Sequence, residues 1–416
     1  MDSIQIDGGI PLQGQVKIQG SKNAALPVLA ATILVRGKSL IENCPKIADV
    51  FQMQALLSSL GCKTAWEGNS LKVDATAVNN SRMPSEEVKA MRSSISLLGA
   101  LIGRTREAIL NFPGGCVIGA RPIDIHLDAL KQMGVVFEEK EDLLYAGAAM
   151  LRGTQIRLRF PSVGATENIL LAAVLAEGET CIENAAREPE IQTLCEFLRQ
   201  AGAWIEGTGT ETLRIRGVSR LEETQFKIPA DRIVAGTYLT GCMLAGGSVF
   251  LKDAPAGQME AVLLAAGRMG VQTQISEEGI FVQAPDRLIS PGKLETAVYP
   301  GFPTDMQSPF LAAMAVAEGE SVLTEVIFEN RFRIAKPLVE MGAKLRIQGQ
   351  TVYVKGVSTL VGAQVEAQEL RGGAALVMAG LGAVGHTRVT GCNFIYRGYE
   401  NIGRDLRELG ARVYSV

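Results

Sequence analysis

The residues best suited to chemistry in this chain lie just before apolar segments. The stretch GSKNAALP, residues 20–27, puts Lys22 and Asn23 directly ahead of a segment that reads as a buried helix. A lysine at a helix start opposes the helix dipole, so its position needs another reason. An anion held by the lysine and by free backbone amides would supply that reason, whereas a solvated surface lysine is the alternative.

Five further apolar segments begin in the same way. The residues at their starts are Arg92, Ser162, Arg232, Asp305 and Arg371. Ser162, Val163 and Gly164 would offer free amides, and Asp305 taken alone would be an N-cap carboxylate. If the helices of one domain run parallel, their N-termini converge on one face. Two such faces opposite each other would form a cleft that attracts a polyanionic substrate.

A lone thiol stands in an unusual loop. FPGGCVIGARPIDIH, residues 112–126, places Cys116 among glycines, five residues before Arg121. A glycine-rich loop of this kind is typical of a segment that carries a catalytic group. The chain has seven cysteines, an odd number, with wide spacing and no C-x-x-C pair. We therefore expect reduced thiols in a cytoplasmic protein, without a disulfide framework or a zinc site, and six of the seven buried as small apolar residues.

Several common classes of function are excluded by the sequence. No phosphate-binding P-loop motif is present, and GLGAVG, residues 380–385, precedes a strand instead of a helix, so we interpret it as a helix-ending turn. Two histidines without a motif around either make a Ser-His-Asp triad improbable. The net charge of -3 argues against a nucleic-acid partner. We expect no signal peptide and no membrane span, because the longest apolar runs are too short.

The elements that must position these residues recur along the chain. Six predicted helices end in glycine just before a strand, at Gly61, Gly134, Gly202, Gly270, Gly342 and Gly410, with steps of 68 to 73 residues. Such a period indicates an internal repeat. Each unit reads as an apolar helix, a strand, an amphipathic helix with a glycine C-cap, and a hairpin. Three buried helices would form the centre of a domain, with sheets outside.

Six units predict two similar α/β domains. The break should fall near KIPADRIVAG, residues 227–236, where Pro229 interrupts the pattern. We expect an N-terminal domain of residues 22–229, which carries the Cys116 loop, and a C-terminal domain of residues 1–21 plus 230–416. The first strands, SIQIDG and GQVKIQG, would return to complete the last units.

The chain resembles the enolpyruvyl transferases essentially from end to end. The motifs that carry the resemblance are GSKNAALP, MRSSISLLG, PGGCVIGARPIDIH, PSVGATEN, ENAAREPEI, FPTDMQ, FENRF, ELRGGAALV and YRGYE. The resemblance implies two domains of three βαβαββ units each, an inside-out α/β barrel fold with the active site in the interdomain cleft. It implies transfer of the enolpyruvyl group of phosphoenolpyruvate to the 3′-hydroxyl of UDP-N-acetylglucosamine, with release of phosphate, by addition and elimination through a tetrahedral intermediate.

This reaction is the first committed step of peptidoglycan synthesis, so the resemblance also implies a part in cell-wall biogenesis, cell shape and division. It implies no cofactor and no metal, two small-molecule substrates, a cytoplasmic location, a monomer, and neither a nucleic-acid nor a membrane partner. The antibiotic fosfomycin would alkylate Cys116.

The resemblance also implies roles for single residues. Cys116 matches the reactive cysteine, a proton donor that also captures phosphoenolpyruvate. Asp305 matches the carboxylate at the sugar hydroxyl, as base or orienting group, and Asn23 matches the contact to the tetrahedral intermediate. The phosphate of phosphoenolpyruvate would meet Lys22, Arg121 and Arg397, and its carboxylate would meet Arg331, Arg371 and Arg397. The UDP-sugar would meet Arg92, Arg121, Pro122, Ile123, Asp124, Ile125, Ser162, Val163, Gly164 and Ile327, with His126 beside the uridine.

Two positions depart from the family pattern. Glu369 stands where an aspartate is usual, which puts the geometry around Lys22 or an arginine in doubt, and Phe160 stands where a basic residue is frequent. Two alternatives remain open. The chain could act on a shikimate phosphate, as a sister branch of the family does, although the Gly-Gly-Cys loop favours the UDP-sugar branch. It could also be a non-catalytic repeat scaffold or a regulatory paralogue, although a scaffold would not need the full set of charged residues.

Overall fold

The computed structural model describes residues 3–83, 95–111, 123–141 and 143–415. The described chain forms two compact units. The N-terminal unit holds the described residues between 20 and 229, and the C-terminal unit holds residues 3–19 and 230–415. The boundary after Gln19 lies two residues before the predicted one, because the backbone amide of Ser21 bonds to Pro229 and that of Asp231 bonds to Gln19.

The N-terminal unit contains seven helical segments and eleven strands among its described residues. The helical segments are α1 (Lys22–Ala31), η1 (Thr32–Leu34), α2 (Ala48–Ser59), α4 (Ser96–Thr105), α5 (Asp124–Gln132), α6 (Val163–Ala173) and α7 (Pro189–Gln200). The strands are β3 (Lys38–Glu42), β4 (Lys63–Glu67), β5 (Ser70–Asp74), β6 (Glu107–Asn111), β7 (Val136–Lys140), β8 (Leu143–Gly147), β9 (Gln155–Arg157), β10 (Glu179–Glu183), β11 (Trp204–Glu206), β12 (Thr212–Arg216) and β13 (Thr224–Lys227).

The C-terminal unit repeats this pattern. Its helical segments are α8 (Arg232–Ala245), η3 (Ala256–Gln258), α9 (Glu260–Arg268), η4 (Thr304–Met306), α10 (Gln307–Val316), η5 (Arg331–Ile334), α11 (Ala335–Glu340), α12 (Leu370–Gly382), α13 (Cys392–Ile395) and α14 (Ile402–Glu408). Its strands are β1 (Ser3–Asp7), β2 (Leu12–Lys17), β14 (Gly247–Lys252), β15 (Gln272–Ser276), β16 (Gly279–Gln283), β17 (Lys293–Glu295), β18 (Glu320–Thr324), β19 (Lys344–Gln348), β20 (Thr351–Lys355), β21 (Gln364–Glu366), β22 (His386–Thr390) and β23 (Arg412–Ser415).

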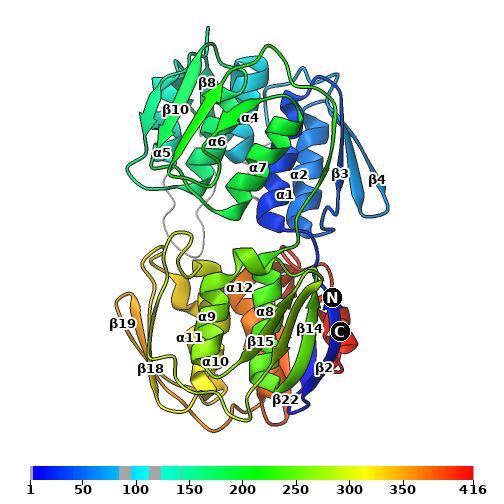
Figure 1. The fold of residues 1–416 in the computed structure, drawn as a ribbon, viewed down its shortest axis with the longest axis vertical. Helices are drawn as coiled ribbons and strands as arrows, with labels where there is room; N and C mark the ends of the chain where they lie inside the picture. The colour runs from blue at the N-terminus through cyan, green and yellow to red at the C-terminus, as the bar shows by residue number, and fades with distance from the viewer. Residues whose placement is uncertain (1–2, 84–94, 112–122, 142, 416) are drawn as a thin grey trace. The chain divides into compact units, whose positions relative to one another are not determined.

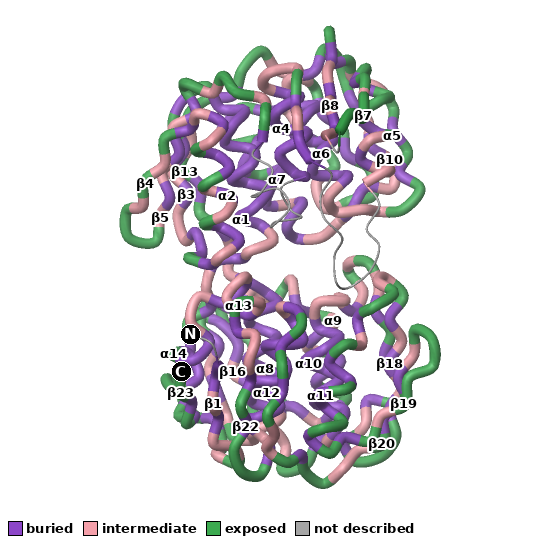
Figure 2. The backbone as a smooth tube through the Cα atoms, turned by 180° about the vertical axis from the view of Figure 1, so that it is seen from behind, coloured by how far each residue is buried: buried purple, intermediate pink, exposed green. Residues whose placement is uncertain are grey.

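Each unit places its helices inside and its sheets outside (Figure 1). All of α1 from Ala24 onward is buried, as is α12 from Arg371 to Leu381. In Figure 2 the buried colour follows these central helices, while the exposed colour gathers at strand turns such as the one between β19 and β20. The predicted centre of buried helices is therefore confirmed, and the hydrophobic effect of burying them is what joins the repeats of each unit.

The buried helices of each unit run parallel. In the N-terminal unit, Ser96 contacts Glu167 near the starts of α4 and α6, and Gly99 contacts Asn168 further along. In the C-terminal unit a Cβ on Gly241 would meet Met378, and one on Gly382 would meet Leu244 further along, so α8 and α12 run in the same direction. The N-termini within one unit therefore share one end of it, as the sequence predicted conditionally.

The six glycine caps are confirmed. The glycines at 61, 134, 202, 270, 342 and 410 all have positive φ, from 84° to 101°. This left-handed conformation is favourable only for glycine, which explains why the helix endings reveal the repeat in the sequence. The GLGAVG stretch is also a helix end, since α12 finishes at Gly382 and β22 follows.

Five sheets have four described strands, and each of them combines two antiparallel pairings with one parallel pairing. The first strands of the chain complete two sheets of the C-terminal unit. β1 lies between β22 and β23, antiparallel to both, and β2 pairs parallel with β14. The sixth sheet has three described strands, β6-β8-β7, and Arg82 forms an isolated parallel bridge to Ile109 on its free side.

Candidate functional site

The C-terminal unit brings Asp305, Arg331 and Arg371 into direct contact. Arg331 Nη2 donates to Asp305 Oδ1, while Arg371 Nη2 and Nε donate to Asp305 Oδ2 at 3.0 and 3.2 Å. The side chains of Arg331 and Arg371 are only 3% and 2% exposed, and that of Asp305 is 24% exposed. Asp305 does not act as the N-cap of α10, because α10 begins at Gln307 and its N-cap position is Met306, which makes no side-chain cap.

The neighbours of Arg371 fix its charge and its direction. Although burial alone would lower the pKa of the Arg371 guanidinium, the Asp305 carboxylate raises it above its ordinary value. Arg371 Nη1 also donates to the hydroxyl of Tyr399 at 3.5 Å, and that hydroxyl bonds to Thr237 Oγ1 at 2.8 Å. The guanidinium is therefore a fixed cation that faces a partly exposed carboxylate.

Glu369, one of the two departures from the family pattern, has a clear structural role. Its carboxylate caps the start of α12 by accepting from the amide of Arg371 at 2.8 Å and from that of Gly372. Arg331 Nη1 lies 3.8 Å from the same carboxylate. A Cβ on Gly372 would meet Glu369 Oε1 at 2.5 Å, so the glycine makes room for this longer side chain.

Sequence reasoning missed Glu325, a fully buried carboxylate at the start of the loop that joins β18 to η5 and contains Ile327. It accepts hydrogen bonds from Thr296 Oγ1 at 2.9 Å, Thr304 Oγ1 at 2.7 Å, and the amides of Ile327 and Phe328 at 2.8 and 3.1 Å. These bonds join the residue before Asp305 to the loop that leads into η5. No motif marks Glu325, because its partners come from three separate segments.

Arg397 lies in the turn that follows α13, and its side chain is half-buried. Tyr399, two residues later, contacts the arginine network through its hydroxyl. Gln19 holds this turn in place. Its Nε2 donates to the carbonyl of Gly398 at 3.1 Å, and its Oε1 accepts from the amide of Glu400 at 2.8 Å. Gln19, the last residue before the chain enters the N-terminal unit, thus positions the turn that carries Arg397.

Lys22 and Asn23 open α1 in the N-terminal unit, with Ser21 as the N-cap. Lys22 Nζ lies 3.4 Å from Asp49 Oδ2, and the two side chains are 14% and 2% exposed. The lysine is therefore not the solvated surface residue of the alternative interpretation. Asp49 stands in the first turn of α2 and was not singled out from the sequence.

The start of α6 is capped by the side chain of Ser162. Ser162 Oγ accepts from the amide of Ala165 at 3.3 Å, and Val163 and Gly164 are the first two residues of the helix. His126 packs against this turn. A Cβ on Gly164 would lie 2.9 Å from His126 Cε1, and His126 Nδ1 lies 2.9 Å from Asn168 Nδ2. The glycine at 164 is therefore required by the close approach of the imidazole ring.

Asp124 opens α5 and pairs with Arg159, whose hydrogen bond is the main reason that the pKa of the aspartate is lowered. Ile123 and Ile125 on either side pack against the core of the unit. A basic residue is frequent in the family at position 160. In this chain the basic residue is Arg159, one position earlier. Phe160 itself is exposed.

Four of the predicted site residues, Arg92, Cys116, Arg121 and Pro122, lie outside the described residues. The other six cysteines are all free, and five of them are buried. Burial raises the pKa of Cys62 to about 12 and the pKa values of Cys195 and Cys242 to about 11.

A second buried carboxyl group that the sequence did not reveal is Glu167, in α6. Ser96 Oγ donates to Glu167 Oε2 at 3.1 Å. Burial raises the pKa of Glu167 to about 8; the Ser96 bond opposes this shift, and the negative charges of Glu190 and Glu188 add to it. The side chain is therefore mostly protonated at neutral pH, close to the end of the unit where α4 and α6 begin.

The protonation of Glu167 predicts a pH-dependent effect of the change Glu167→Gln. Between pH 4.5 and 8 the folded wild type binds a proton that the unfolded chain releases, so its stability falls as the pH rises through this window. Glutamine does not titrate. We expect the variant to match the wild type near pH 4.5 and to be more stable by roughly 4 kcal/mol at pH 8.

Urea unfolding followed by tryptophan fluorescence measures this difference, because both tryptophans, Trp66 and Trp204, belong to the N-terminal unit. Glu206→Gln removes an exposed carboxylate from the same unit and is the matched control. A stability difference that stays constant from pH 5 to pH 8 would mean that Glu167 is ionised in the folded protein.

Among the described residues, no group of three histidine, cysteine, aspartate or glutamate side chains is arranged to hold a metal ion. No helix within the described parts of the chain has the length and apolar character needed to cross a bilayer.

Comparison with known proteins places these residues in a family. Residues 6–406 match the family model described as EPSP synthase (3-phosphoshikimate 1-carboxyvinyltransferase). The chain is 44% identical to UDP-N-acetylglucosamine 1-carboxyvinyltransferase 2 of Caldanaerobacter subterraneus subsp. tengcongensis, over 100% of both chains. It is also 44% identical to UDP-N-acetylglucosamine 1-carboxyvinyltransferase of Nitratidesulfovibrio vulgaris strain DP4, over 99% of both chains.

Solved structures agree on the fold. The enolpyruvyl transferase NikO of Streptomyces tendae superimposes with a TM-score of 0.90 at 24% identity, covering 99% of this chain and 98% of its own. EPSP synthase of Acinetobacter baumannii reaches a TM-score of 0.76 at 17% identity, covering 100% and 99%. The predicted fold class is confirmed. The chain therefore belongs to the enolpyruvyl transferase family, and within it to the UDP-N-acetylglucosamine 1-carboxyvinyltransferases.

Proposed function

We propose that the chain transfers the enolpyruvyl group of phosphoenolpyruvate to the 3′-hydroxyl of UDP-N-acetylglucosamine and releases inorganic phosphate, the first committed step of peptidoglycan synthesis. In the addition step the sugar oxygen bonds to C2 of phosphoenolpyruvate while a proton is added to C3. In the elimination step C3 loses a proton and the C2–O bond to phosphate breaks. Atoms and charge then balance without a redox partner or a cofactor.

The observation that carries this proposal is the contact of Asp305 with two buried arginines. A carboxylate that is 24% exposed is accessible to a hydroxyl group and suited to accept its proton. Arg331 Nε is buried and has no hydrogen-bond partner among the described residues, so this guanidinium keeps a free donor. A guanidinium fork binds carboxylate through two parallel bonds, which is how Arg331, Arg371 and Arg397 would hold the carboxylate of phosphoenolpyruvate.

The N-terminal unit contributes groups suited to the other anionic parts of the substrates. Lys22, with Arg121 and Arg397, would hold the phosphate of phosphoenolpyruvate, and its ion pair with Asp49 keeps the ammonium in one place. The free amides at the start of α6 suit a diphosphate, because a helix N-terminus attracts negative charge. Asn23 would contact the intermediate. Asp124 would contact the UDP-sugar together with the other residues of its turn.

The substrates are the protein's partners and it works as a monomer in the cytoplasm, without nucleic acid, membrane, metal or cofactor. The Cys116 segment supplies the proton for C3. The chain would work as two domains of three βαβαββ units each, 22–229 and 1–21 plus 230–416.

Phosphate release tests the proposal directly. The protein is incubated with phosphoenolpyruvate and either UDP-N-acetylglucosamine or shikimate 3-phosphate. We expect stoichiometric phosphate release with the UDP-sugar and none with the shikimate ester. Release with shikimate 3-phosphate alone would assign the chain to the other branch of the family, and release with neither acceptor would favour the non-catalytic scaffold.

The thiols give an independent prediction. Incubation with fosfomycin should produce one adduct, on Cys116, and UDP-N-acetylglucosamine should accelerate it. The thiolate is the reactive form, and the raised pKa values of Cys62, Cys195 and Cys242 leave almost none of it at neutral pH. Peptide mass spectrometry locates the adduct, with the partly exposed Cys181 as the internal control. Equal labelling of Cys181 would contradict a specially activated Cys116.

A further inference from the structure

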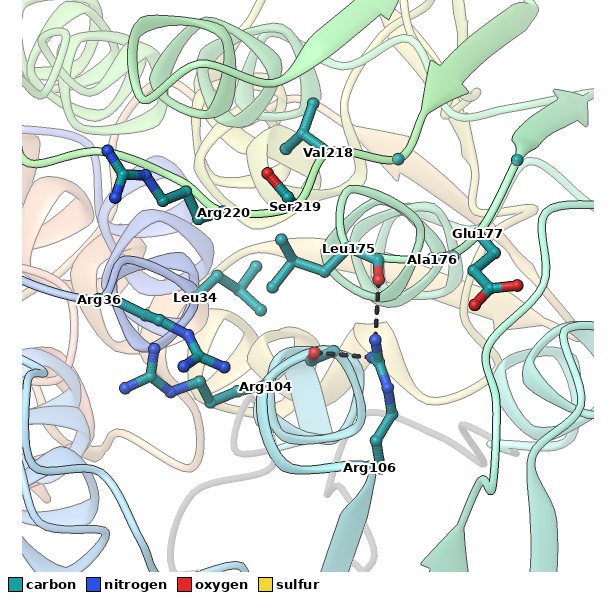
Figure 3. A pocket seen from close by; sticks show the side chains of 13 residues that line it. Leu34, Arg36, Arg104, Arg106, Leu175, Ala176, Glu177, Val218, Ser219 and Arg220 are labelled. Carbon is teal, nitrogen blue, oxygen red and sulfur yellow. Dashed lines mark hydrogen bonds between the residues drawn. The ribbon is translucent and has the colours of Figure 1, made fainter.

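A basic pocket lies at the opposite end of the buried helices in the N-terminal unit. There the structure has an open pocket of about 520 Å³, which Figure 3 shows. Residues at the C-terminal ends of the three parallel helices line it, namely Leu34, Gly103 and Leu175. Lys22 and Ser162 stand at the other ends of α1 and α6. This pocket is therefore separate from the residues assigned to the transferase reaction.

The pocket is strongly basic. Four arginines line it, Arg36, Arg104, Arg106 and Arg220, against one carboxylate, Glu177. Such an excess of positive charge is unfavourable, because like charges at close range repel each other. In Figure 3 the guanidinium groups of Arg36 and Arg104 lie side by side.

Capping of helix ends explains only one of these arginines. Arg106 Nη1 donates to the carbonyls of Ile102 and Gly103 at 3.2 and 2.8 Å, and its Nη2 donates to Leu175 at 2.9 Å (Figure 3). These bonds satisfy the free carbonyls at the ends of α4 and α6. The conformation of Arg106 costs energy, since its φ is 64°, and a left-handed residue other than glycine is unfavourable by roughly 1 kcal/mol.

The other repeats show that arginine is not needed for the fold at this turn. The residue before the equivalent strand is a glycine with positive φ in four other repeats, at Gly178, Gly246, Gly319 and Gly385. Arg106 alone replaces this glycine by a cation at the edge of the pocket. The C-terminal unit has no arginine at the corresponding helix ends, where the sequence reads AGG, AEG and AVG.

Two of the remaining arginines keep donors that nothing in the described chain uses. Arg36 is exposed and forms no hydrogen bond or ion pair with the described residues. Arg104 Nη2 donates to the carbonyl of Ala75 at 3.0 Å, but its Nη1 is buried and has no hydrogen-bond partner. Burial lowers the pKa of Arg104, and the nearby charge of Arg36 lowers it further. An anion between the two groups would satisfy the buried donor and remove the repulsion.

We propose that this pocket binds a phosphorylated small molecule, with its phosphate between Arg36 and Arg104 and its less polar part along Leu34, Leu175 and Val218. Guanidinium groups suit phosphate because their donors form a fork that matches its oxygens. The volume falls within the range of small-molecule sites in proteins. Arg220, which pairs with Glu222 at 2.6 Å on the rim, adds to the positive field.

Pyrophosphate is the probe for this site, measured without turnover so that the result does not depend on the transferase reaction. We expect it to slow amide hydrogen exchange in residues 101–106 and 217–220, which border the pocket. In the double variant Arg36→Ser/Arg220→Ser this protection should disappear, and the calorimetric affinity of the site should fall at least about tenfold, as expected for the loss of charge-assisted bonds to phosphate. Both side chains are exposed, so the variant should fold and release phosphate from its substrates at the wild-type rate.

The control Arg157→Ser/Arg214→Ser removes the same charge from exposed positions of the same unit, 81% and 56% exposed, outside the pocket. A Lys22→Ala variant should keep the protection at residues 101–106, because its change lies at the other end of α1. The proposal is wrong if pyrophosphate leaves these amides unprotected, if the control variant loses as much affinity as the pocket variant, or if sulfate binds equally well, since that would indicate unspecific attraction of anions.

Discussion

An Asp305→Asn variant is expected to lose roughly a thousandfold in kcat while its KM for phosphoenolpyruvate does not rise. A positioned base contributes about 10²- to 10⁴-fold to a proton transfer, and asparagine cannot accept the proton. The same change frees Arg331 and Arg371 from their carboxylate partner. Both arginines would then face the substrate carboxylate with less competition, so binding is maintained while the chemical step is slowed.

Asparagine is a better replacement for Asp305 than alanine, because its side chain keeps an oxygen that can accept a hydrogen bond. An Asp305→Ala variant would leave two guanidinium groups, 3% and 2% exposed, without their shared partner, and breaking such a buried pair costs about 3–5 kcal/mol. Asparagine keeps an oxygen for one of them. We therefore expect the alanine variant to lose stability as well as activity, and the asparagine variant to lose mainly activity.

Steady-state kinetics with both substrates varied, together with thermal unfolding, separate these effects. Asp286→Asn is the matched control, because Asp286 is exposed, belongs to the same unit and makes no contact with the network. If Asp305→Asn raised KM for phosphoenolpyruvate in proportion to its loss of kcat/KM, the carboxylate would be an orienting group for the arginines and not the base.

The repeat made most of the fold predictable from sequence. Every unit carries two local features, a glycine with positive φ at a helix end and a helix that is apolar on every side. Because these features occur in six copies, they all indicate the same repeated α/β unit. The site was predictable only where a residue type conflicts with its local position. Lys22 at a helix start and Arg371 before a buried helix are such conflicts, and both have charged partners in the structure.

The residues that sequence reasoning missed share another property. A carboxylate does not conflict with the local structure at any of three positions, Glu325, Asp49 and Glu167. Each of these residues has its role because of a partner that is distant in sequence. Ser96 and Glu167, for example, are 71 residues apart. Asp305 was likewise interpreted as an N-cap when taken alone, because Arg371, its partner, lies 66 residues further along the chain. Only the tertiary packing of the helices brings these groups together.

The second large effect is expected from Glu325→Ala. This change removes the only carboxylate that the side chains of Thr296 and Thr304 and the amides of Ile327 and Phe328 share. A buried donor left without an acceptor costs about 1–3 kcal/mol, so we expect a loss of roughly 3–5 kcal/mol after partial relaxation. The segment between β18 and η5 would loosen, and kcat/KM would fall by about 10²-fold, because misplacing a substrate-binding group by 1 Å has an effect of that size.

Glu325→Gln separates the loss of an acceptor from the loss of a charge. Its amide oxygen can still accept from Ile327 and Phe328, and its NH₂ group can donate to the hydroxyl of Thr304, so most stability and activity should return. Hydrogen exchange at residues 325–330 should be fast in the alanine variant and near normal in the glutamine variant. Glu329→Ala, an exposed change in the same loop, controls for a general effect on the segment. Equal losses in the glutamine and alanine variants would show that the charge of Glu325 matters more than its hydrogen-bond pattern.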